Sequence, residues 1–264
     1  MRGSHLVLPR LYDAYHAYIL QNDDRRVVFM IPFQQHYTLI GTTDVAHEGD
    51  PAHPEASAEE ADYLCRAVNR YLARPCAPAQ AVWRYAGVRP LHDDGTSDPS
   101  AITRDYTLRV DDLEGAAPVL SVFGGKITTY RRLAEHVLEK LEPYFPRMTA
   151  AWTAGSPLPG GDFGGGSAAQ ALAALAVRYA GLPQETLEGV LRRHGMRAVE
   201  VLGEARTASD LGEDFGAGLC ERELSYLQQC EWARSAEDVL WRRTKCGLAM
   251  SAVQRARVAE RIGR

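Results

Sequence analysis

The sequence predicts an α+β fold, in which an antiparallel β-sheet domain with flanking helices is followed by an all-helical C-terminal domain. Three observations lead to this prediction. Short apolar runs rich in β-branched residues alternate with polar turns in residues 1–155, a glycine-rich stretch follows at residues 160–166, and the strand pattern disappears from Ser167 onward. In that last part Ala, Leu, Glu and Arg dominate, and apolar residues recur at the helical spacing i, i+3 and i+4.

The first domain is predicted to contain several short strands joined by polar turns. Short polar connections between apolar runs, such as QNDD at residues 21–24, are typical of an antiparallel meander. The runs with strand character are residues 17–20, 26–31, 37–43, 82–88, 106–110 and 119–123.

Helices are predicted at residues 57–72, with Ser57 as the N-cap, at residues 128–141, and about four or five times after Ser167. The domain boundaries follow from these patterns. Residues 1–155 form the first domain and residues 167–264 the helical domain. Residues 156–166 are expected to be a linker, because so many glycines cannot hold a regular element cheaply.

Composition and charge exclude several classes of protein. The chain is 45% hydrophobic and carries a net charge of −4, which argues against a polycation that binds nucleic acid. It has no run of 18 apolar residues that could span a bilayer, and its first residues lack the apolar core of a signal peptide. Its five widely spaced cysteines form no metal-type pair, so we expect reduced thiols in a cytoplasmic protein and no metal site.

The string VLSVFGGKITTY at residues 119–130 carries the strongest chemical signal. Two glycines between a strand and a helix let the backbone approach a ligand, and the helix amides together with Lys126 favour negative charge there. A reduced flavin ring or a phosphate would suit this place. A plain strand–turn–helix connection with a surface lysine fits as well. The first glycine of the P-loop pattern is missing.

Three other residues are candidates on weaker grounds. Arg89 follows an apolar strand and precedes a proline, so its guanidinium could offer a bidentate fork to an oxyanion. Arg104 alternates with Asp105 on a predicted strand and could face the same site. His5, which we expect just before a strand, could accept a proton from a carbinol. Structural salt bridges and an exposed histidine are the ordinary alternatives. The turn GTTD at residues 41–44 also fits simple turn hydrogen bonds.

The last 24 residues are basic. Residues 241–264 carry seven Lys or Arg against one Glu, a local charge of +6. Such a helical end could contact anionic lipid, although a solvated charged face is the more usual explanation.

Together, several strings resemble the FAD-dependent, respiratory glycerol-3-phosphate dehydrogenases in order and spacing. The resemblance covers nearly the whole chain, and it assigns RGSH at residues 2–5 to the family pattern and not to an expression tag. The strings are RGSHLVLPR at 2–10, IGTTD at 40–44, YAGVRPL at 85–91, ITRDYTL at 102–108, LSVFGGKITTYR at 120–131, SDLGEDF at 209–215 and LWRRTK at 240–245.

The resemblance implies oxidation of sn-glycerol 3-phosphate to dihydroxyacetone phosphate, with hydride transfer to FAD and electrons passed to quinone. Arg89 and Arg104 would bind the substrate phosphate, His5 would lie near the reacting carbinol as the base, and Lys126 would sit by the flavin or the substrate. The residues expected along the flavin ring are Gly124, Gly125, Lys126, Ile127 and Thr128. The resemblance further implies a peripheral protein on the cytoplasmic face of the inner membrane, with homo-oligomers allowed.

The family's strand–GxGxxG–helix motif for the dinucleotide is not found in these residues. We therefore expect the chain to be the C-terminal part of such an enzyme and to show little activity alone. Two alternatives stay open. One is a glycerol-3-phosphate oxidase that passes electrons to oxygen, and the other is a non-catalytic fragment that acts as an interaction module.

Overall fold

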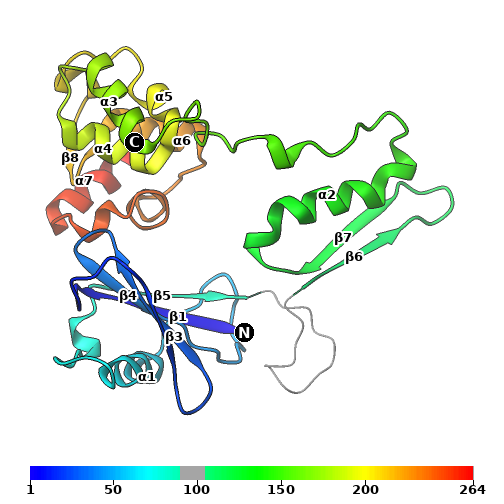
Figure 1. The fold of residues 1–264 in the computed structure, drawn as a ribbon, viewed down its shortest axis with the longest axis horizontal. Coiled ribbons are helices and arrows are strands. Elements are labelled where there is room, and N and C mark those ends of the chain that lie inside the picture. The colour runs from blue at the N-terminus through cyan, green and yellow to red at the C-terminus, as the bar shows by residue number, and fades with distance from the viewer. Residues whose placement is uncertain (90–104, 264) are drawn as a thin grey trace. The chain divides into compact units, whose positions relative to one another are not determined.

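The computed structural model describes residues 1–89 and 105–263, so the expected site residue Arg104 lies outside the described residues. The chain divides into two compact units, Met1–Ala154 and Gly155–Arg264. Antiparallel sheets occupy the first unit and helices dominate the second, which confirms the predicted α+β class (Figure 1).

The main sheet of the first unit has five antiparallel strands in the order β2-β3-β4-β1-β5. The predicted meander is confirmed as β2–β3–β4, and β1 lies between β4 and β5. His5 was expected to precede a strand, but it lies inside β1, where it pairs with Gly41 and Tyr85. The strands are β1 Arg2–Pro9, β2 Tyr18–Gln21, β3 Val27–Phe33, β4 Tyr37–Gly41 and β5 Trp83–Val88.

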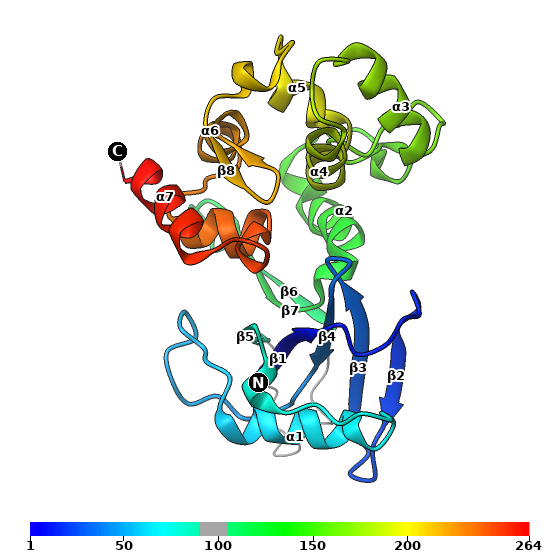
Figure 2. The same ribbon diagram turned by 90° about the vertical axis from the view of Figure 1, so that its left-hand side faces the viewer.

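Helix α1 (Ala58–Asn69) covers one face of this sheet (Figure 2). Its Leu64 and Val68 are fully buried, together with Leu6 and Ile40 from the strands. Ser57 caps the helix as expected, in a reciprocal capping box with Glu60. Because side chains alternate along a strand, the residues next to Leu6 in β1 point to the other face of the sheet.

A hairpin and a helix complete the first unit. Strand β6 (Tyr106–Asp111) pairs with β7 (Val119–Gly124), and α2 (Tyr130–Leu141) follows the short 3₁₀ helix η2 (Ile127–Thr129). The remaining 3₁₀ turns are η1 (Pro78–Gln80), η3 (Glu142–Tyr144) and η4 (Thr153–Gly155).

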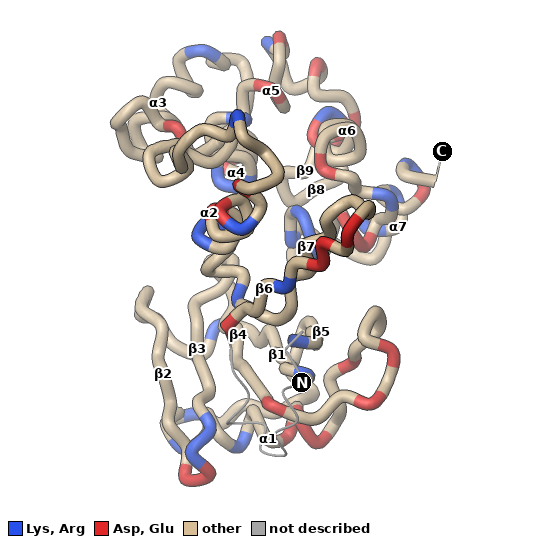
Figure 3. Tube along the Cα trace, turned by 90° about the vertical axis from the view of Figure 1, so that its right-hand side faces the viewer, with Lys and Arg blue, Asp and Glu red and all other residues tan. Residues whose placement is uncertain are grey.

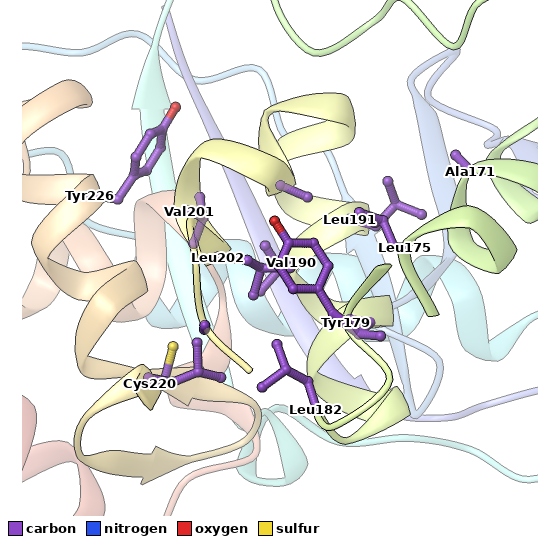
Figure 4. Packing of buried hydrophobic residues seen from close by; sticks show 14 residues of the cluster. Ala171, Leu175, Tyr179, Leu182, Val190, Leu191, Val201, Leu202, Cys220 and Tyr226 are labelled. Carbon is purple, nitrogen blue, oxygen red and sulfur yellow. The ribbon is translucent and has the colours of Figure 1, made fainter. Parts of the chain in front are cut away.

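The second unit packs its helices around Leu175, Val190, Leu191 and Leu202, with the Tyr179 hydroxyl donating to the Gly203 carbonyl at 2.9 Å (Figure 4). A two-stranded ladder, which the sequence patterns did not predict, joins β8 (Asp214–Gly216) to β9 (Leu219–Cys220). The helices are α3 Ala168–Arg178, α4 Gln184–His194, α5 Ala198–Leu202, α6 Glu221–Cys230, the π-helix η7 Asp238–Arg243 and α7 Ala252–Ile262, with 3₁₀ turns η5 Gly195–Arg197, η6 Ala208–Leu211 and η8 Cys246–Leu248.

The glycine-rich segment packs against the helices that follow it. It falls within the second unit, where Phe163 packs against the helical core. The Met196 amide donates to the Gly160 carbonyl at 2.9 Å, and a Cβ on Gly160 would lie 2.4 Å from the His194 carbonyl oxygen. Gly160 therefore allows close backbone packing at this position.

Charged residues of both signs are interspersed along the chain (Figure 3). The basic C-terminal stretch follows this pattern, because four of its guanidinium groups pair with carboxylates from outside residues 241–264. The ion pairs are Arg242 with Glu237 and Asp238, Arg243 with Glu231, Arg257 with Glu213, and Arg261 with Glu221.

All five cysteines are free thiols. Within residues 1–89 and 105–263, no helix combines the length and the apolar character needed to cross a membrane.

Candidate active site

The face of the main sheet opposite α1 carries a row of residues in cross-strand register. Ile19 pairs with Phe29, Phe29 with Gly41, Gly41 with His5, and His5 with Tyr85. Directly paired residues share a face of the sheet. Ile19 is 69% exposed and Phe29 is 36% exposed, so the row runs from open apolar residues to the polar pair His5 and Tyr85.

His5 is held by its two neighbours in this row. Its ring stacks on Tyr85 with centroids 5.0 Å apart and an interplanar angle of 6°. A Cβ on Gly41 would lie 2.2 Å from His5 Cδ2, so the ring occupies the space that only glycine leaves free. Trp83 packs against Tyr85 at 4.6 Å and extends the aromatic support.

This environment lowers the pKa of His5 to about 4, first because burial disfavours the charged ring and second because of the positive charge of Arg89. His5 Nδ1 is shielded from solvent and has no hydrogen-bond partner within the described ranges 1–89 and 105–263. A buried imidazole nitrogen without a partner is costly, so the site favours a group that can bond to it.

Arg89 follows β5 and reaches the end of β4. Its guanidinium forms an ion pair with Asp44 through Nη1 and donates to Thr42 Oγ1 from Nη2 at 3.2 Å. A Cβ on Gly3 would lie 2.8 Å from Nη2, so the guanidinium passes close over the backbone of β1. The side chain is still 32% exposed, which leaves part of the fork open to an anion.

The flavin-type motif forms the strand–turn–helix connection that its sequence predicts. Strand β7 ends at Gly124 with φ of 70°, and Gly125 follows with φ of 91°. Thr129, the residue before α2, makes no side-chain cap hydrogen bond. Lys126, Ile127 and Thr128 are exposed.

The structure thus brings His5 and Arg89 together, on β1 and at the end of β5. The GGKIT segment lies on another part of the first unit, and its role stays a prediction. Gly3 and Tyr85 were not singled out as site residues by the sequence, although both lie within family-type strings. The turn GTTD at residues 41–44 fitted a plain turn, yet Asp44 and Thr42 hold Arg89.

Comparison with known proteins supports the sequence resemblance. A family model described as FAD dependent oxidoreductase matches residues 1–131, and one described as C-terminal domain of alpha-glycerophosphate oxidase matches residues 151–262. The chain is 48% identical over 260 residues to the aerobic glycerol-3-phosphate dehydrogenase of Escherichia coli, covering 98% of this chain and 52% of that protein. It is 41% identical over 260 residues to D-erythritol 1-phosphate dehydrogenase of Brucella abortus, again covering 98% of this chain and 52% of that protein.

Among solved structures, the FAD complex of glycerol-3-phosphate dehydrogenase from Bacillus halodurans has the same fold with a TM-score of 0.75. The two chains are 22% identical, and the match covers 99% of this chain and 55% of that one. The chain spans about half the length of the curated relatives it matches. On these matches, the chain is similar over nearly its whole length to about half the length of the FAD-dependent glycerol-3-phosphate dehydrogenases.

Proposed function

We propose that this chain carries the substrate side of an FAD-dependent dehydrogenase that oxidises sn-glycerol 3-phosphate to dihydroxyacetone phosphate as part of the intact enzyme. The observation that carries the proposal is that His5 and Arg89 lie close together at one end of the sheet. A proton acceptor and an anion-binding fork in one place match the two ends of a polyol phosphate.

Arg89 would bind the phosphate. Asp44 and Thr42 already orient its guanidinium, so little side-chain freedom is lost when a phosphate binds to the exposed part of the fork. Arg104, from the ITRDYTL string, is proposed as a second phosphate ligand on the family resemblance alone.

His5 would accept the proton of the carbinol. It is neutral at pH 7 because its pKa is lowered to about 4, so it enters the reaction in the accepting form. The charge of Arg89 contributes to that lowering. A phosphate dianion bound to Arg89 would offset this charge and raise the pKa of His5, so substrate binding would strengthen the base.

The residues expected along the flavin would lie beside its ring. Gly124 and Gly125 adopt positive φ and present no side chain, and no side chain caps the start of α2, which follows Lys126 after the short helix η2. These groups would stabilise negative charge on the ring. When bound, the flavin would supply the two-electron acceptor for the substrate hydrogen.

The electron acceptor distinguishes two versions of the proposal. Electrons pass to quinone in a respiratory dehydrogenase and to oxygen in an oxidase. We favour quinone because of the LWRRTK string, and we extend the proposal to peripheral membrane contact and to homo-oligomers. The carboxylate pairing of Arg242 and Arg243 leaves less free positive charge for lipid contact than the sequence suggested.

The proposal is tested by the concentration dependence of sn-glycerol 3-phosphate oxidation by the intact enzyme that contains this chain, with FAD and an artificial electron acceptor. Arg89→Ala is expected to raise KM by about 10- to 100-fold, the loss of a hydrogen bond to a charged group. The matched control is Arg84→Ala, which removes an exposed arginine of β5 that bonds only to the Pro78 carbonyl in the described structure. An unchanged KM in Arg89→Ala would remove this residue from the phosphate site.

D-Erythritol 1-phosphate is included as a second substrate in the same assay. If this longer polyol phosphate is oxidised faster than sn-glycerol 3-phosphate, D-erythritol 1-phosphate becomes the proposed substrate. No oxidation of either compound would favour the non-catalytic interaction module.

A further inference from the structure

We propose that Glu60 is a positioning residue for the active site, because its buried carboxylate ties together the two chain segments that carry His5, Thr42 and Asp44. The effect of Glu60 on catalysis rests on the function proposed above. Neither the sequence motifs nor the comparisons single out this residue.

The carboxylate of Glu60 lies between α1 and the sheet, and its side chain is 6% exposed. Oε1 accepts hydrogen bonds from Ser4 Oγ at 2.9 Å and from Thr43 Oγ1 at 2.6 Å. Oε2 accepts from Arg2 Nη2 at 2.7 Å and from the Ser57 amide at 3.0 Å. A carboxylate has about four acceptor directions, and here they serve α1, β1 and the turn after β4.

The residues that Glu60 contacts alternate with the site residues. Ser4 precedes His5, and Thr43 lies between Thr42 and Asp44. The side chains of Ser4 and Thr43 bond to Glu60, whereas those of Thr42 and Asp44 bond to Arg89. Along β1, His5 points to the opposite face from Ser4, so one carboxylate holds the backbone next to the site residues.

Side chains carry the link between the two segments at this point. The β1–β4 ladder ends at the pair His5 and Gly41, and backbone bonding resumes with Arg2 and Val45, at 2.7 and 3.0 Å. In between, the Ser4 amide donates to Thr43 Oγ1 at 2.9 Å, and Thr43 in turn donates to Glu60. Loss of the carboxylate acceptor therefore loosens the place where the site residues leave the sheet.

Helix capping alone does not require this arrangement. A capping box needs only the contact between Glu60 and the Ser57 amide, and the exposed boxes of α3 and α7 use Gln170 and Gln254 for the same purpose. Burial raises the pKa of Glu60, but hydrogen bonds from Thr43, Ser57, Ser4 and Arg2 outweigh this and lower it, so the group stays ionised at neutral pH.

The proposal is tested with Glu60→Gln in the full chain. Glutamine keeps the capping contact if its oxygen faces the Ser57 amide, but its NH₂ group cannot accept from Ser4 and Thr43. Thr43→Val breaks the same link without touching the helix cap. The controls are Glu59→Gln, which removes the charge of an exposed neighbour, and Thr43→Ser, which keeps the hydroxyl.

The first readout is the titration of the His5 ring by NMR, which requires no substrate or flavin. The His5 ring is faced by Tyr85 and Arg89 from β5 and its end, and by Asp44 through its pair with Arg89. Glu60→Gln and Thr43→Val are expected to move the His5 midpoint from about 4 toward the free value of about 6.5, by about one pH unit or more. Both controls are expected to titrate like the parent chain.

The second readout is the pH profile of kcat/KM for sn-glycerol 3-phosphate. In the two test variants its acid limb should move with the His5 midpoint, and kcat/KM should fall on the order of 10²-fold, as expected for a misplaced catalytic group. An unchanged His5 midpoint in folded Glu60→Gln or in folded Thr43→Val overturns the positioning role, even where the parent oxidises the substrate. If the His5 midpoint shifts in the two variants but the parent protein does not oxidise sn-glycerol 3-phosphate, the positioning role is supported and the proposed function is rejected.

Discussion

Acidification should destabilise the first unit through His5. The pKa of His5 is about 4 in the folded chain and about 6.5 for a free histidine side chain. Between these pH values the unfolded chain binds more protons than the folded chain, so the free energy of unfolding falls as the pH falls. The contribution of His5 to the free energy of unfolding is fully present above about pH 6.5 and is lost as the pH approaches about 4.

The magnitude follows from the size of the shift. One pKa unit corresponds to about 1.4 kcal/mol, so the shift of His5 corresponds to about 3 kcal/mol between neutral pH and pH 4. This is a large part of the stability of an ordinary domain.

The assay is urea unfolding of the full chain at pH 7.0, 6.0, 5.0 and 4.5, followed by tryptophan fluorescence. Trp83 packs against Tyr85 beside His5 and reports on this part of the sheet. His5→Phe keeps a ring in the space over Gly41 but does not titrate, and His36→Phe changes an exposed histidine. The free energy of unfolding should depend less steeply on pH in His5→Phe than in the parent and in His36→Phe. Equal pH dependence in all three proteins would refute the burial argument for His5.

Three further predictions concern other parts of the chain. Glu223→Gln is expected to lower the free energy of unfolding of the second unit by about 3–5 kcal/mol, because the fully buried Glu223 pairs with Arg193; a cost below that of Glu237→Gln at the surface would contradict this. Gly41→Ala places a Cβ 2.2 Å from His5 Cδ2, and thermal unfolding should show a loss of about 1–3 kcal/mol, whereas an unchanged melting temperature would show that the ring moves freely. Lys126→Met should lower kcat or flavin retention. The control Lys140→Met changes an exposed residue of α2 and should leave both unchanged. If the two variants have the same kcat and flavin retention, Lys126 does not contact the flavin.

The strands and helices of the first unit were predictable because each apolar run is short and separated by polar residues. The pattern placed the meander β2–β4 and the Ser57 cap correctly. Strand β1 was placed too late, since Gly3 and Ser4 have low strand preference. Their positions are set by contacts far along the chain, with Arg89 over Gly3 and Glu60 bonded to Ser4.

The candidate site was predictable only in part. The sequence could single out His5 and Arg89 because imidazole and guanidinium groups have a recognisable chemistry, and their roles stay predictions. The sequence did not single out Asp44, Gly41 or Glu60. Their contacts depend on which segments lie close together in space, and the sequence alone does not give these distances. The glycine-rich segment shows a related limit of sequence patterns. Glycine serves close backbone packing as well as flexibility, as it does at Gly160.

The most direct test of the proposed function is an anaerobic visible spectrum of the intact enzyme that contains this chain, taken after FAD has been added and the excess removed. We predict a retained flavin band that sn-glycerol 3-phosphate bleaches in the parent and in Arg84→Ala, but in Arg89→Ala only at much higher substrate concentration. A retained band that the substrate does not bleach, or no retained flavin at all, would contradict the claim that this chain carries the substrate side of a polyol phosphate oxidation site.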